Sequence, residues 1–425
     1  MTVSPELDPR RIAAEVVRRA LEEDAFAAAV LSAALDAAPQ LDARDRAFAT
    51  ELTYGTLRSA RFLEGRLGKH APRGLAALDA ATRAHLLVGA YQLALLDRVP
   101  AHAAVGAAVE AIKLTRGRGL ASFANAVLRR LSEDEGARVS PTDAVRAGAP
   151  RWLVRALDRA LGEGAGNEFL SAGPVPPPLG LRVRRGEVDA HVAAIVAAVP
   201  GADVSRGRAA SAAILVRGGG DPRRLPGVAD GSLVVQEEGS QAVAEALGAK
   251  AGEVVLDACA GRGNKTLALL DAVTVTGRVD AADLHPAKLD RLQIEAKKLG
   301  LTIGERHGVD WTVGRGDVPA STYDRVLVDA PCSGIGTLRR RPEILLRRTE
   351  ADLALLGETQ RAILRNAATA LKPGGTLLYA VCSVLREEAE DVASTLDGFD
   401  VASVRRLLPH VEGTDGYTVI TLSPR

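Results

Sequence analysis

Two of the three cysteines in this chain directly follow an apolar run and precede a serine, an arrangement that could expose a thiol. Cys332 stands in VLVDAPCSG and Cys382 in LLYAVCS, whereas Cys259 lies in VVLDACAG. A thiol acts as a nucleophile when it is partly exposed and its pKa is lowered, but a cysteine in a core is simply a small hydrophobic residue. No two cysteines form a CxxC pair, so the sequence predicts neither a disulfide framework nor a zinc site.

A glycine turn between an apolar run and a predicted helix is the second candidate site. The stretch VVLDACAGRGNKT is no phosphate-binding loop, because Asn264 precedes Lys265 and Cys259 takes the place of the first glycine. A dinucleotide fingerprint would need a glycine where Thr266 stands. The third interpretation is a site for S-adenosylmethionine, which has no pyrophosphate. Its predicted residues are Cys259, Ala260, Gly261, Arg262, Gly263, Asn264 and Lys265.

Three aspartates stand where successive strands of this region are expected to end. Asp283 follows the glycine turn by about 20 residues, the spacing at which an acid can accept hydrogen bonds from ribose hydroxyls. Asp310 could accept a hydrogen bond from an adenine amino group. Either residue alone would be read as a helix N-cap or a turn residue. Together with Asp329 they predict a cofactor site at one edge of a sheet.

Cysteines beside such a site suit methyl transfer to a pyrimidine carbon. Carbon 5 of cytosine is a weak nucleophile, but addition of a thiolate at carbon 6 makes the ring enamine-like and carbon 5 reactive. An acid near the ring nitrogen would stabilise the charge that develops, a role available to Asp329. The sequence therefore predicts Cys382, Cys332 and Asp329 as catalytic residues.

Periodicity and punctuation divide the chain into four parts. Residues 1–140 are rich in alanine and leucine at helical spacing, which predicts an all-α domain of about five to seven helices. Residues 141–178 are proline-rich and predict a linker with a short helix, PRWLVRALDRAL. Residues 179–238 predict a small α+β module. Residues 239–425 alternate strands and helices, which predicts a Rossmann-like α/β domain that binds ligands beyond the carboxyl ends of its strands.

Composition narrows the class of protein. Hydrophobic residues make up 47% of the chain, and 54 basic residues balance 53 acidic ones, so the chain can build cores but has no generally basic surface. The N-terminus lacks the charge order of a signal peptide, and no apolar stretch reaches the roughly 18 residues of a membrane span. We therefore expect a soluble, cytoplasmic, monomeric protein without a membrane or metal partner.

Arginines gather after the Cys332 turn and at one strand of the small module. A run of charge is usually a solvated face, but beside a proposed active site it suits phosphate contacts. Aromatic residues make up only 3% of the chain, so recognition of a nucleic acid by shape, with one base flipped into the pocket, is favoured over stacking. The predicted contacts to nucleic-acid phosphates are Arg339, Arg340 and Arg341, with Arg182 and Arg184 as weaker candidates.

Several of these motifs resemble those of the RsmB/Sun-type RNA (cytosine-5) methyltransferases. DAPCSG with the following arginines, and YAVCSVLREEAEDV, are similar to the two cysteine motifs of that family, and DACAGRGNKT is similar to its cofactor motif. PPPLGLRVRRGE and LPGVADGSLVVQEEGSQ resemble its small RNA-contacting module. ELTYGTLR and FANAVLRRL resemble its N-terminal NusB-like domain. The resemblance covers nearly the full length, and the cysteine motifs are its most specific part.

The resemblance implies a role for each site residue. Cys382 would be the nucleophile, Cys332 would assist release of the methylated product, and Asp329 would hold the cytosine edge. The implied reaction is S-adenosylmethionine-dependent methylation of carbon 5 of a cytosine in small-subunit ribosomal RNA, through a covalent adduct at carbon 6. The cofactor turn departs from the family pattern C-A-A-P-G-G-K, since Arg262 replaces the proline and Asn264 a glycine.

Two alternatives belong to other classes of protein. One is a non-catalytic RNA-binding or antitermination-type protein with a decayed cofactor site, which binding of S-adenosylmethionine would exclude. The other is methylation of an amino group, for which a motif such as Asn-Pro-Pro-Tyr would be expected where Asp329-Ala330-Pro331-Cys332 stands.

Overall fold

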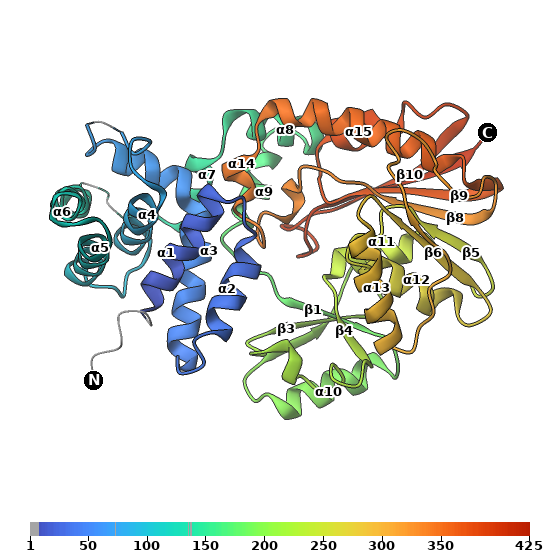
Figure 1. Ribbon diagram of the computed structural model, residues 1–425, viewed down its shortest axis with the longest axis horizontal. Helices are drawn as coiled ribbons and strands as arrows, with labels where there is room; N and C mark the ends of the chain where they lie inside the picture. Colours follow the sequence, from blue (N-terminus) through green and yellow to red (C-terminus); the bar gives the residue numbers. More distant parts are fainter. Residues whose placement is uncertain (1–7, 73, 135, 137) are drawn as a thin grey trace. The chain divides into compact units, whose positions relative to one another are not determined.

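The computed structural model describes residues 8–425 except 73, 135 and 137, and the chain forms two compact units (Figure 1). The first unit comprises the chain up to residue 158 together with residues 162–176 and 338–348. The second unit comprises residues 159–161, 177–337 and 349–425. The segment 338–348 follows the Cys332 turn in sequence, yet it belongs to the first unit.

Helices build the first unit, as the sequence predicted for residues 1–140. The described residues of that range form six helices, and further short helices complete the unit. The helices are α1 (Pro9–Glu22), α2 (Ala27–Asp36), α3 (Ala43–Gly68), α4 (Ala80–Leu95), α5 (Ala101–Arg116), α6 (Arg118–Glu133), α7 (Pro141–Gly148), α8 (Arg151–Leu161, whose last turn falls in the second unit), α9 (Ala165–Ser171) and α14 (Ile344–Arg347).

Capping side chains define where several of these helices begin. The Asp42 carboxylate accepts the backbone N–H of Asp45 at the start of α3, and the Ser140 hydroxyl accepts that of Asp143 at the start of α7. Each cap satisfies a backbone donor that the first helical turn leaves without a partner. Asp42, Pro100 and Ser140 are the N-cap residues of α3, α5 and α7.

Residues 141–178 differ from the predicted linker, because they contain α7, α8 and α9 instead of one short helix. Pro141 occupies the first turn of α7 and Pro150 is the N-cap of α8, so both prolines start helices. A proline is tolerated there because the first-turn N–H groups have no intrahelical acceptor. Buried Val145 and Leu153 anchor the segment in place.

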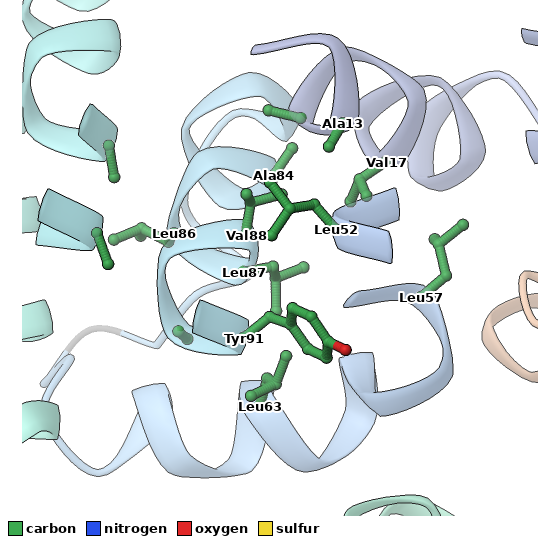
Figure 2. Packing of buried hydrophobic residues seen from close by; sticks show 14 of the residues in the cluster. Ala13, Val17, Leu52, Leu57, Leu63, Ala84, Leu86, Leu87, Val88 and Tyr91 are labelled. Atoms are coloured by element: carbon green, nitrogen blue, oxygen red, sulfur yellow. The ribbon is translucent and has the colours of Figure 1, made fainter. Parts of the chain in front are cut away.

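The core of the helical unit lies between α1, α3 and α4. Figure 2 shows Val17 of α1, Leu52 of α3 and Leu87 of α4 converging, and all three side chains are buried. Full burial of such side chains is worth about 1.5–3 kcal/mol each. At the centre, Gly55 of α3 lies against the ring of Tyr91, and a β-carbon on Gly55 would overlap that ring.

A small antiparallel sheet opens the second unit and confirms the α+β pattern of residues 179–238. Its strand order is β2-β3-β1-β4, and buried Leu181, Ile195 and Ile214 form the core between the sheet and α10. Strand β2 was not predicted from the sequence. The elements are β1 (Leu179–Val183), α10 (Val188–Ala198), β2 (Asp203–Arg206), β3 (Ala213–Arg217), the short 3-10 helix η2 (Pro222–Arg224) and β4 (Leu233–Val235).

The seven-stranded main sheet has the order β10-β11-β9-β8-β5-β6-β7 (Figure 1). Strands β5 to β9 run parallel, as predicted, and β10 and β11 add an antiparallel edge that the sequence did not predict. The strands are β5 (Val254–Asp257), β6 (Arg278–Asp283), β7 (Arg306–Gly308), β8 (Tyr323–Asp329), β9 (Leu371–Val381), β10 (Phe399–Leu407) and β11 (Tyr417–Pro424). The helices are α11 (Glu238–Ala246), α12 (Asn264–Val273), α13 (Pro286–Lys298), α15 (Glu350–Ala368) and α16 (Glu390–Ala393), with 3-10 turns η3 (Ile335–Thr337) and η4 (Arg386–Glu388).

The sheet order reverses between β5 and β8. From β5 the chain builds outward through β6 and β7, and it then returns to place β8 and β9 on the other side of β5. Alternate residues of the central strands pack on opposite faces, with Leu256 and Val326 in one core and Val255 and Leu327 in the other. In open α/β sheets the crevice at such a reversal is where ligands bind.

Every helix in the described part of the chain is too short or too polar to span a lipid bilayer.

Replacement of Gly55 by alanine should destabilise the helical unit. The added methyl group would overlap the ring of Tyr91. This ring cannot easily move away, because its side chain is buried and its hydroxyl is hydrogen-bonded to Glu51. We therefore expect the free energy of unfolding to fall by about 1–3 kcal/mol. Gly65→Ala in the same helix is the matched control, because no atom lies near its β-carbon position. That control should gain up to about 1 kcal/mol from helix propensity. Denaturant unfolding measures both, and equal stabilities would contradict the packing described.

Candidate functional site

The predicted cofactor turn lies between β5 and α12, at the reversal point of the sheet. Gly261 and Gly263 have φ values of 57° and 86°, in the left-handed region that favours glycine. A β-carbon on Gly263 would strike Leu292 of α13, so only glycine fits the turn there. The turn borders a cavity of about 150 Å³, whose lining residues are Ser240, Asp257, Cys259, Ala260, Gly261, Arg262, Gly263, Asn264, Lys265 and Asp329.

Asp257 is a lining residue that sequence reasoning missed. It ends β5 just as Asp283 ends β6 and Asp329 ends β8, so the strand-end signal could have identified it. One carboxylate oxygen, Oδ2, accepts the Thr266 hydroxyl at 2.7 Å, and the other, Oδ1, has no hydrogen-bond partner among the described residues. Burial raises the pKa of Asp257 to about 6.

Asp283 and Asp310 lie at the ends of β6 and β7, as the sequence predicted, but neither lines this cavity. The carboxylate of Asp283 accepts the N–H of Gly261 at 3.0 Å and that of His285 at 2.8 Å. Asp283 thus stabilises the backbone of the glycine turn without lining the cavity. Asp310 accepts the N–H and hydroxyl of Thr312, the local turn contact of a short polar residue.

Lys265 connects the cofactor turn to the predicted catalytic residues. Its Nζ donates to Asp329 Oδ2 at 2.7 Å and lies 5.7 Å from the centre of the Tyr417 ring. Burial alone would lower the pKa of Lys265, but the Asp329 carboxylate outweighs that effect and raises it. Lys265 also interacts electrostatically with Cys382. The site therefore holds one buried positive charge between a carboxylate and a thiol.

The two predicted catalytic thiols lie side by side. Cys332 Sγ and Cys382 Sγ are 3.3 Å apart, and both residues are half-buried. They follow the neighbouring parallel strands β8 and β9, where Asp329 is paired with Ala380. The hydrogen bond to Cys382, followed by burial, raises the pKa of Cys332 well above its ordinary value. Cys332 is therefore held as a protonated thiol next to Cys382.

Two further polar residues, which sequence reasoning also missed, hold the turn that carries Cys332. The buried carboxylate of Glu388 accepts the N–H of Ser333 at 2.6 Å, and Gln360 Nε2 donates to the Pro331 carbonyl at 2.9 Å. Glu388 lies in the quoted stretch REEAEDV after Cys382, but nothing in the sequence distinguishes it from its acidic neighbours.

The predicted RNA contacts take part in intramolecular interactions. Arg182 and Arg184 both pair with Asp271, and their side chains are only 7% and 5% exposed. Within the helical unit, Arg339 is buried and its carbonyl accepts from Arg58, while Arg341 stacks on Phe26 at 4.6 Å. A guanidinium with a buried protein partner has fewer donors left for phosphate. Arg182 and Arg184 are therefore poor candidates for contacts to RNA.

No group of three histidine, cysteine or acidic side chains is arranged to hold a metal ion within residues 8–72, 74–134, 136 and 138–425.

Mild oxidation should join Cys332 and Cys382 in a disulfide. Their sulfurs are 3.3 Å apart, and closure to the bonded distance of about 2.05 Å needs only a small side-chain movement. Hydrogen peroxide would take up both thiol hydrogens, with release of water, and peptide mapping by mass spectrometry should find the linked peptides. Cys259 should stay unlinked. Exclusive oxidation of Cys259 would show that the pair is not in contact.

Replacement of Asp257 by asparagine should remove a pH dependence of stability. The folded-state pKa of about 6 lies above the unfolded value of 3.8, so the folded state binds more protons and stability falls as pH rises from 4 to 6. The difference corresponds to about 3 kcal/mol for the wild type relative to Asp257→Asn. Unfolding free energies at pH 4 and pH 8 measure it. A difference that is the same at both pH values would contradict the burial of a charge at this position.

Comparison with known proteins places both units in families. Residues 244–416 match the family described as 16S rRNA methyltransferase RsmB/F, and residues 7–133 match the NusB family. The chain is 34% identical over 418 residues to ribosomal RNA small subunit methyltransferase B of Vibrio cholerae, covering 92% of this chain and 93% of that protein. The Pseudomonas putida protein of the same name is 34% identical over 399 residues, covering 91% and 88%.

Solved structures share the fold. The crystal structure of PH0851 has a TM-score of 0.84 at 22% identity and covers 100% of this chain and 99% of that chain. The structure of NSun6 from Pyrococcus horikoshii with SFG has a TM-score of 0.58 at 16% identity and covers 65% and 98%. At these identities the likeness supports the fold alone. The sequence matches go further, and the chain belongs to the RsmB/F family of S-adenosylmethionine-dependent ribosomal RNA methyltransferases, with an N-terminal NusB domain.

Proposed function

We propose that this protein methylates carbon 5 of a cytosine in small-subunit ribosomal RNA through a covalent cysteine adduct at carbon 6. The observation that carries the proposal is the pair of thiols 3.3 Å apart, beyond the ends of the adjacent strands β8 and β9, of which β8 ends in the cavity-lining Asp329. A methyltransferase that acts on an amino group has no use for two cysteines at this place. The attack on a pyrimidine ring and its reversal each have a use for one.

The turn after β5 fits S-adenosylmethionine by its own chemistry. Gly261 and Gly263 leave the backbone open to a ligand, and the unpartnered Oδ1 of Asp257 offers an acceptor inside the cavity. Arg262 and Asn264 do not disturb this shape, because the turn keeps its left-handed glycines on either side of Arg262. When bound, S-adenosylmethionine supplies an electrophilic methyl group.

Cys382 is the proposed nucleophile. Its sulfur would form a bond to carbon 6 of cytosine, and the electron pair of the 5,6 double bond would become available at carbon 5. The positive charge of Lys265 interacts electrostatically with Cys382, so the surroundings of the proposed nucleophile include a cation. The Lys265–Asp329 pair would face the ring edge, where it stabilises the charge that develops on addition.

Cys332 is the proposed partner for the last step. After methylation, a base such as solvent water takes the proton from carbon 5, the C–H electron pair restores the 5,6 double bond, and the Cys382 sulfur leaves carbon 6 as a thiolate. The protonated Cys332 thiol lies against Cys382, where it can hydrogen-bond the departing sulfur. The two cysteines thus divide addition and release between them.

The substrate assignment follows from the relatives. The Vibrio cholerae and Pseudomonas putida relatives, which cover about nine tenths of this chain, are named ribosomal RNA small subunit methyltransferase B, which supports small-subunit ribosomal RNA as the target. Arg339, Arg340 and Arg341 remain the predicted RNA contacts, although Arg339 is buried and the guanidinium of Arg341 stacks on Phe26.

The two cysteine variants should separate addition from release. Cys382→Ala should lose methyl transfer completely while RNA still binds, because no thiol remains to add to carbon 6. Cys332→Ala should add to RNA but release it slowly, so a denaturing gel should show a labelled, nuclease-sensitive protein–RNA adduct with labelled S-adenosylmethionine.

The double variant Cys332→Ala, Cys382→Ala is the matched control and should form no adduct. Sequencing of the trapped RNA would identify the target cytosine. Normal turnover by Cys382→Ala would sink the nucleophile assignment. Absence of an adduct with Cys332→Ala, in a protein that still binds S-adenosylmethionine, would remove Cys332 from the release step.

A further inference from the structure

We propose that Glu388 is a positioning residue that fixes the Cys332 turn in the geometry needed for product release. The inference rests on the proposed function of Cys332 and adds a residue outside the cofactor turn and the cysteine pair. Glu388 does not touch the cavity that would hold the cofactor, so it would act through the turn alone.

Glu388 and Gln360 together form hydrogen bonds with the turn on both sides of Cys332. After the cysteine, the carboxylate accepts the Ser333 N–H at 2.6 Å and the Ser333 hydroxyl at 2.5 Å. Before the cysteine, Gln360 Nε2 donates to the Pro331 carbonyl at 2.9 Å and also to Glu388 Oε1 at 3.3 Å. One buried carboxylate and one amide therefore hold the residues on either side of the thiol.

The burial of Glu388 is unusual enough to need an explanation. Its side chain is completely buried, and no lysine or arginine forms an ion pair with it in the described part of the chain. A buried carboxylate without a cation is costly unless its oxygens accept strong hydrogen bonds. Here the Ser333 and Gln360 donors supply those bonds, so the carboxylate and the turn stabilise each other.

The side chain of Glu388 is not required to hold its own backbone in place. The Tyr379 hydroxyl donates to the Glu388 carbonyl at 2.6 Å, which ties η4 to β9 independently of the carboxylate. The carboxylate contacts are directed at Ser333 and Gln360 instead. A change in the side chain should therefore loosen the Cys332 turn more than the strand that carries Cys382.

Position and charge both matter to the Cys332 thiol. Its sulfur must stay within 3.3 Å of Cys382, and a displacement of about 1 Å can reduce a rate a hundredfold. The negative charge of Glu388 adds to the hydrogen bond from Cys382 and to burial in raising the pKa of Cys332. This keeps the proton on Cys332 until release.

Glu388→Gln tests the proposal with little change in size. The amide has one acceptor oxygen in place of two, so it can accept only one of the two Ser333 bonds. We expect formation of the adduct and the affinity for S-adenosylmethionine to stay at wild-type values, while release of methylated RNA slows by about ten- to a hundredfold. Rapid-quench single-turnover kinetics on denaturing gels would measure adduct formation and release separately. A merely structural defect would lower cofactor binding and adduct formation as well.

Glu387→Gln is the matched control, since it removes the adjacent charge of the same turn, where Glu387 pairs with Arg159. It should release product at the wild-type rate. Ser333→Ala removes the hydroxyl bond to Glu388, together with the 3.3 Å bond from the Ile335 N–H, and serves if Glu388→Gln fails to fold. It should slow release by roughly three- to tenfold.

The two levels of the hypothesis fail differently. Release at the wild-type rate by Glu388→Gln, or by Ser333→Ala if the first variant does not fold, would overturn the role of Glu388 while Cys332→Ala still traps the adduct. Absence of an adduct with Cys332→Ala would overturn the release role of Cys332 itself, and the positioning role of Glu388 with it.

Discussion

The parallel pairing of β8 with β9 is the constraint on which the site depends. It brings together two cysteines that are 50 residues apart in the chain, by setting Asp329 opposite Ala380. The N–H of Ala330 donates to the Ala380 carbonyl, and that of Gly336 donates to the Cys382 carbonyl, so the pairing continues beyond the strands. Gly336 has no room for a β-carbon, which would overlap the Gly416 carbonyl. The approach of the two thiols thus follows from backbone geometry.

The three carboxylates of the site have different kinds of partner. Asp329 has a lysine partner, and Glu388 has a set of neutral donors. Asp257 has one hydroxyl donor and a free oxygen, so its charged form is destabilised and its pKa rises. Burial would otherwise penalise the charged forms of Asp257 and Glu388, which are both almost completely buried. The one left incompletely satisfied lines the cavity at the cofactor turn, as expected of an oxygen reserved for a ligand.

The arginine-rich segment after the Cys332 turn makes structural contacts that its sequence did not indicate. Arg347 donates to the carbonyls of Ala20 and Ala25, and Arg61 donates to the Leu345 carbonyl. Glu343 is buried, and burial raises its pKa. In Figure 1 the short helix α14 belongs with the N-terminal helices even though its colour marks it as a late part of the chain. These contacts therefore hold residues 338–348, the segment that follows the Cys332 turn, within the helical unit.

Local patterns in the sequence were sufficient for most of the helices and strands and for the motifs that identify the family. Helical spacing and capping residues predicted the α1–α6 unit, and apolar runs ending in acids predicted β5, β6 and β8. The cysteines and the glycine turn could be recognised because each depends on residue type and on neighbours close in sequence. The family resemblance at these motifs is confirmed by the match over residues 244–416.

Only the tertiary structure decided which of several similar residues does what. Glu387 and Glu388 are alike in sequence, but one pairs with Arg159 at the surface and the other is buried against Ser333. The sequence suggests that Arg182 and Arg184 form a basic strand end. In the structure both side chains donate to Asp271, which lies 89 and 87 residues away in the chain. The β10–β11 edge and the helices α7 and α9 were missed for the same reason. Long-range partners and burial determine these outcomes, and neither is encoded in the spacing of neighbouring residues.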